Sequence, residues 1–112
     1  MPVDATDTPV LDTLAGITAA SVENCDLIPR EVMMARIAAL VAVGGPPASY
    51  LLNAGTAVDV GITLADVEGI LIAVAPIVGT PRVVTAAGNL ARALGFAVAA
   101  MDAEDDISVT ND

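Results

Sequence analysis

The chain has 112 residues, with 14 acidic and four basic side chains, and its formal charge is −10. This length fits a single domain. Four scattered arginines do not make the basic stripe that nucleic-acid binding requires, so we expect no nucleic-acid partner.

The acidity is concentrated near the two ends of the chain, which carry eight of the fourteen acidic residues. We therefore predict flexible acidic segments at residues 1–8 and 101–112 and one helical domain at residues 9–100. The eight residues are Asp4, Asp7, Asp12, Asp102, Glu104, Asp105, Asp106 and Asp112.

The apolar content is high for so small a protein, since 55% of the residues are hydrophobic and 16% are charged. A small monomer must cover a large surface with polar groups, so the surplus favours burial against other subunits, in a homo-oligomer. The uncharged stretch from Ile37 to Val58 is long enough to cross a bilayer. However, the glycines and prolines at 44–47 would break such a helix, which favours two buried helices and no membrane contact.

Cys25 is the only cysteine, so the chain cannot form an internal disulfide. Neighbouring carboxylates at Glu23 and Asp26 disfavour its thiolate, which argues against a reactive nucleophile. The first residues lack a basic start followed by an apolar run, so a cytoplasmic location is expected.

Proline and glycine divide the first half of the chain into three predicted helices. The first begins at Pro9 behind a cap residue and ends near Asn24. A second helix opens at Pro29 and closes at Gly44. The third runs from Pro47 to about Val60, and Gly61 follows as a stop signal.

Two more helices are predicted in the second half. Thr63 and Asp66 have capping-box spacing at the start of a fourth helix, which Pro76 is expected to kink or end. The last helix is expected from about Pro81 to Ala99, with one side that we interpret as a subunit interface or solvent face; it carries Arg82, Asn89 and Arg92. With no hairpin or alternating pattern, the sequence predicts an all-α fold of about five helices in a compact bundle.

Several residues and motifs that are common in enzyme active sites are missing from this sequence. The sequence has no histidine, no cysteine pair, no phosphate-binding loop and no serine nucleophile elbow. We therefore expect no cofactor and no metal, and any catalysis would depend on carboxylates, arginine, tyrosine or the single thiol.

Several segments together resemble the carboxymuconolactone decarboxylase and alkylhydroperoxidase-D-like family. Arg-Glu at 30–31 opens an apolar helix, and Gly-Thr-Ala-Val-Asp-Val-Gly-Ile-Thr at 55–63 ends the next. Asp-Val-Glu-Gly-Ile-Leu follows at 66–71 and Gly-Thr-Pro-Arg at 79–82. The resemblance spans residues 29–95 and implies an all-helical subunit that assembles into dimers, trimers or hexamers.

The family's redox branch carries a Cys-x-x-Cys-x-x-x-His motif on the helix before the Gly-x-Thr junction. In this chain the two cysteine positions fall on Pro46 and Ser49, and the histidine position falls on Asn53. A peroxidase needs two thiols, and the lyase branch relies on a histidine on the same helix. Neither chemistry is expected to carry over unchanged.

Polar residues around these positions form the candidate site. Ser49, Tyr50 and Asn53 share a helix face by spacing and can hydrogen-bond a small polar ligand, although capping and interhelical hydrogen bonds are the simpler explanation for these residues. The resemblance implies Glu31 as a general base, because a first-turn glutamate leads the pocket helix in the family. Stabilisation of a helix N-terminus is the alternative role for Glu31.

Arg36 is the candidate clamp for a substrate carboxylate, because its guanidinium matches that geometry. The alternative is an ion pair with Glu31, or with Asp66 or Glu68 of another helix.

Two functions remain open from the sequence. The favoured one is a non-catalytic relative that keeps the helical oligomer as a small-molecule-binding or structural module. The other is a cofactor-free lyase or isomerase acting on a small apolar acid or lactone, in which Glu31, Tyr50 and Asn53 act on a substrate held by Arg36 and Ser49. An open cavity beside Asn53 would favour the enzyme, and one filled with side chains would favour the module.

Overall fold

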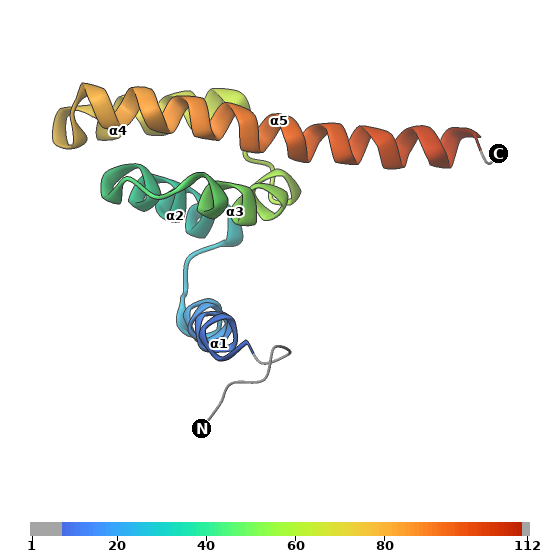
Figure 1. Cartoon of the computed structure of the whole chain (residues 1–112), viewed down its shortest axis with the longest axis horizontal. Coiled ribbons are helices and arrows are strands. Elements are labelled where there is room, and N and C mark those ends of the chain that lie inside the picture. Colours follow the sequence, from blue (N-terminus) through green and yellow to red (C-terminus); the bar gives the residue numbers. More distant parts are fainter. Residues whose placement is uncertain (1–7, 111–112) are drawn as a thin grey trace.

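The computed structural model describes residues 8–110, and the side chains of residues 8–95. Within this range the chain forms five helices and no strand, which confirms the all-α prediction (Figure 1). They are α1 (Pro9–Asn24), α2 (Pro29–Val43), α3 (Pro47–Asp59), α4 (Leu64–Val78) and α5 (Thr80–Thr110). The predicted flexible ends lie partly outside the described residues, at 1–7 and 111–112.

The helix boundaries follow local backbone chemistry. Pro9, Pro29 and Pro47 each occupy the first turn of a helix. Backbone N–H groups in the first turn have no acceptor within the helix, so proline, which lacks an N–H, costs no hydrogen bond there. At the end of α2, Gly44 adopts a left-handed φ of 68° and its N–H donates to the carbonyls of Leu40 and Val41. The predicted pair of short helices joined by a turn is therefore confirmed, in place of one long span.

The capping box predicted at the start of α4 is present. The Asp66 N–H donates to Thr63 Oγ1 at 3.1 Å, and the Thr63 N–H donates back to Asp66 Oδ2 at 2.8 Å. These two bonds satisfy backbone donors that a helix start leaves without partners.

The predicted end of the last helix is wrong, and so is one of the two alternatives at Pro76, that it ends the fourth helix. The fourth helix continues through Pro76 to Val78. Pro76 lies in the last turn, so its ring removes only the bond to the carbonyl of Ile72, and Ile72 is itself exposed to solvent. The last helix continues past Ala99 to Thr110, because no proline or glycine interrupts it after Gly95.

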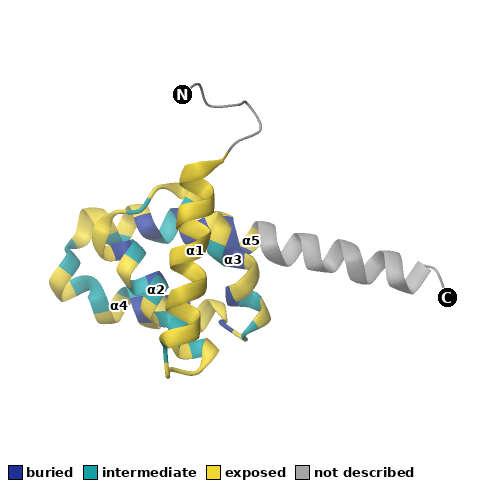
Figure 2. Cartoon of the chain, turned by 90° about the horizontal axis from the view of Figure 1, so that it is seen from below, coloured by how far each residue is buried: buried dark blue, intermediate teal, exposed yellow. Residues whose placement is uncertain are grey.

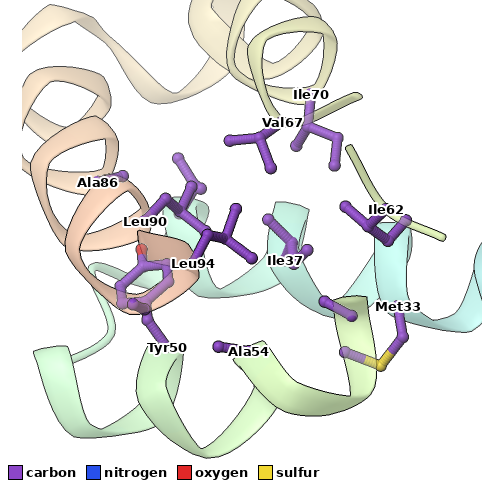
Figure 3. Close-up of a cluster of buried hydrophobic side chains, with 13 residues drawn as sticks. Met33, Ile37, Tyr50, Ala54, Ile62, Val67, Ile70, Ala86, Leu90 and Leu94 are labelled. Atoms are coloured by element: carbon purple, nitrogen blue, oxygen red, sulfur yellow. The ribbon is translucent and has the colours of Figure 1, made fainter. Parts of the chain in front are cut away.

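The core lies between two layers of helices, α2 with α3 and α4 with α5. Figure 3 shows Ile37 of α2 and Ala54 of α3 facing Leu90 and Leu94 of α5. Small side chains dominate the contact of α3 with α5, where Ala54, Ala57, Ala86 and Ala93 are all buried. Such residues let the two backbones approach closely, which explains the alanine density of the sequence.

Helix α1 stands apart from this bundle. None of its residues is buried, although it carries five large apolar side chains that are each more than half exposed: Val10, Leu11, Leu14, Ile17 and Val22. Figure 1 shows α1 end-on beyond the α2 and α3 layer, and Figure 2 shows its exposed length crossing that layer. The apolar face of α1 therefore has no complete partner within the described part of the chain.

Candidate functional site

The interior next to Asn53 is almost completely filled. The space enclosed there by α2, α3 and α5 has a volume of about 10 Å³, and its walls include Ile37, Tyr50 and Leu94. A water molecule needs roughly 10–15 Å³ of such space, so no organic ligand fits. The interior on this side of Asn53 therefore has no room for a buried active site, but the open cleft described next also borders Asn53, so the criterion set from the sequence does not decide between module and enzyme.

A second and larger space lies on the other side of Asn53. It is an open cleft of about 370 Å³ between α1 on one side and α2 with α3 on the other. Its walls include Ile17 and Ser21 of α1, Arg36 and Leu40 of α2, and Asn53 of α3. This cleft exists because α1 does not pack closely against the bundle.

Arg36 and Asn53 are brought together in this cleft. The half-buried Arg36 donates from Nη2 to Ser21 Oγ at 3.3 Å, which is the contact that joins α1 to α2. Asn53 is also half-buried, and its Nδ2 donates to the Ser49 carbonyl at 2.8 Å. The Asn53 bond is the local capping role weighed as the simpler explanation.

Tyr50 points into the core rather than into the cleft. Only 3% of its surface is exposed, and Figure 3 shows its ring beside Leu90 and Leu94. Burial raises the pKa of the Tyr50 hydroxyl, because the phenolate is poorly solvated there. Tyr50 is thereby kept as a neutral core residue and is not among the cleft walls that hold Asn53.

Glu31 lies at the exposed N-terminus of α2, where its Oε1 accepts the Ile28 N–H at 3.2 Å. This is the helix-start role that the sequence left open as the alternative to a general base. Neither Glu31 nor Ser49 belongs to the walls of the cleft or of the small interior space.

The ion pair predicted between α2 and α4 involves a different arginine. Arg30, not Arg36, pairs with Asp66 across the two helices. The pKa of the Asp66 carboxyl is held below its ordinary value, first by the Thr63 N–H and then by the Arg30 guanidinium and the Thr63 hydroxyl. Within the described residues Arg36 has no carboxylate at ion-pair distance.

Asn89 is a residue that the sequence interpretation misplaced. It is 6% exposed, so the prediction of a solvent or interface position is wrong for this residue. Arg92 Nη2 donates to Asn89 Oδ1 at 2.9 Å. This bond makes the buried amide tolerable. The i,i+3 spacing of the two residues was the only available signal, and it does not reveal which side of α5 faces α3.

No described helix is long and apolar enough to cross a membrane, and no cluster of His, Cys, Asp or Glu among the described side chains of residues 8–95 is arranged to hold a metal. Comparison with known proteins finds no matching family model, no matching curated protein and no matching solved structure. The resemblance to the carboxymuconolactone decarboxylase family accordingly stays a prediction from the sequence.

Proposed function

We propose that this protein is a self-assembling helical module, similar in fold to carboxymuconolactone decarboxylases but without their thiol or histidine chemistry. The observation that carries the proposal is the unpartnered apolar face of α1, which contributes no buried residue. A helix with such a face becomes stable by packing it against another element. The corresponding face of a second copy is a symmetric way to supply that element.

The large apolar side chains that the described residues leave exposed support assembly. Besides the five on α1, they include Val43 of α2 and Ile72 and Ile77 of α4.

The filled interior supports a module rather than a lyase. Glu31, Tyr50 and Asn53 are the residues that the sequence assigns to catalysis. Glu31 lies at the exposed start of α2, whereas Tyr50 and Asn53 share only an interior space of about 10 Å³, which is too small for a substrate. General acid–base catalysis requires its groups within hydrogen-bond reach of one substrate. This arrangement does not provide that reach within one subunit.

The proposal is tested by charging the apolar face of α1. Leu14 is 53% exposed on this face, and Ala19 lies about 140° away around the helix. We expect Leu14→Lys to lower the native mass measured by light scattering, because a lysine ammonium would be buried in the interface. Ala19→Lys adds the same charge outside that face and should leave the native mass unchanged.

A native mass that is the same for the wild type and both variants would show that the apolar face of α1 is not an assembly surface. Far-UV circular dichroism of each variant confirms that a change in mass does not reflect unfolding.

A further inference from the structure

The cleft between α1 and the bundle has walls of two kinds. One part is apolar, formed by Ile17 of α1 with Leu40 and Val43 of α2. The other part is polar, formed by Ser21, Arg36 and Asn53. At about 370 Å³ the cleft lies at the lower end of the range for small-molecule sites, about 300–1,000 Å³. An occupant must therefore be small, with one polar end and one apolar end.

Arg36 determines the charge of that polar end. Its guanidinium carries five N–H donors, and its one hydrogen bond in the described structure goes to the neutral hydroxyl of Ser21. Arg30, by comparison, is paired with Asp66. A half-buried cation facing apolar walls without a counter-ion is unfavourable, and a carboxylate supplies both the charge and a matching pair of acceptors.

Asn53 and Ser21 add neutral polar groups beside Arg36. The Nδ2 of Asn53 is held by the Ser49 carbonyl, which fixes the amide while its oxygen and second N–H stay unused by that bond. The cleft thus offers one cation and two neutral polar groups, which match the single charge of a monoanion. A phosphate carries up to two negative charges, and the strongly acidic chain would repel it more.

We propose that this cleft binds a small aliphatic monocarboxylate, with its carboxylate on Arg36 beside Ser21 and its chain against Ile17, Leu40 and Val43. The ligand fills the space that separates α1 from the bundle and so fixes α1 in place. This inference goes beyond the self-assembling module. Ile17 belongs both to the cleft and to the apolar face of α1, but Leu14, the residue substituted to test assembly, is not among the cleft walls.

Octanoate is a suitable probe, with octanol and octyltrimethylammonium as neutral and cationic compounds of the same chain length. Isothermal titration calorimetry of the wild type should detect octanoate binding at least ten times tighter than binding of either comparison compound. Arg36→Gln should weaken octanoate binding at least tenfold. Arg92→Gln removes the same charge from α5, outside the cleft, and should bind octanoate like the wild type.

Equal binding of the three compounds, or equal octanoate binding by the wild type and Arg36→Gln, would overturn the proposal. So would the absence of octanoate binding together with a change in native mass in Arg36→Gln, because the cleft would then be a contact with a second copy. Should Arg36→Gln fail to fold, Ala39→Phe gives the same test, because Ala39 is an exposed residue of the cleft wall and the larger side chain occupies the space. Unchanged octanoate binding in Ala39→Phe would contradict the assignment, whatever the native mass of the wild type.

Discussion

Asn53 shows most clearly what this chain can do at the position where the resembling family carries a histidine. Its amide neither accepts a proton at neutral pH nor attacks a substrate, but it can hold a fixed orientation through the Ser49 carbonyl. It has a filled interior on one side and the open cleft on the other. A residue placed in this way can serve recognition or packing, and we expect it not to take the reactive role that the histidine has in the resembling family.

The charge of the Asp66 carboxylate stabilises the folded state through its contacts with Thr63 and Arg30. Because its pKa is lowered on folding, its charge stabilises the native state above the unfolded value of 3.8, and this stabilisation is lost as the pH falls through the lower folded pKa. Asp66→Asn should therefore reduce the urea midpoint at neutral pH, with a difference from the wild type that disappears in acid. Asp59→Asn at the exposed end of α3 is the control and should show no such convergence. A gap in midpoint that persists in acid would refute the electrostatic explanation.

Two substitutions of Glu31 test whether its role is to stabilise the start of α2. Glu31→Ala should lower the free energy of unfolding by about 1 kcal/mol, because it removes the acceptor for the Ile28 N–H. Glu31→Gln keeps an oxygen at the same place and should restore most of that loss in urea unfolding. Equal destabilisation by both substitutions would mean that the hydrogen bond to Ile28 does not matter.

At the scale of the elements, the sequence predicts where a helix begins better than where it ends. Pro9, Pro29 and Pro47 mark starts through a local restriction on φ that no tertiary contact changes. The continuation of α4 past Pro76 depends on which carbonyl is exposed, and that is decided by packing. For the same reason the burial of Asn89 could not be predicted, whereas the existence and type of all five helices could.

Two glycines, one in the turn between α2 and α3 and one inside α3, give stability predictions of opposite sign. Gly44 has a φ of 68°, so Gly44→Ala should destabilise the protein by about 1–2 kcal/mol. Gly55 lies inside α3 with open space where a Cβ would be, so Gly55→Ala should stabilise it by about 0.5–1 kcal/mol. Thermal unfolding of both variants against the wild type measures the two effects. A stabilising Gly44→Ala would contradict the left-handed turn.

The candidate site illustrates the limit of spacing arguments. Spacing places Ser49, Tyr50 and Asn53 near one another on α3, and they do lie within two turns of that helix. It does not reveal that Tyr50 faces α5 while Asn53 also borders the cleft, because those surroundings come from other helices. Likewise, the pairing of Arg30 rather than Arg36 with Asp66 depends on how α2 and α4 cross.

At the scale of the whole molecule, the apolar face of α1 has no complete partner among the residues that the structure describes. Burying an exposed leucine or isoleucine gains about 1.5–3 kcal/mol, and α1 alone offers several such side chains. Association of copies recovers this free energy without any change in the fold of the subunit.

The most direct test of this account is native mass spectrometry of the unmodified protein at micromolar concentration. The account predicts one discrete species whose mass is a small integer multiple of 11.2 kDa. A single species at 11.2 kDa would contradict it, because the apolar face of α1 would then be stable in water without a partner.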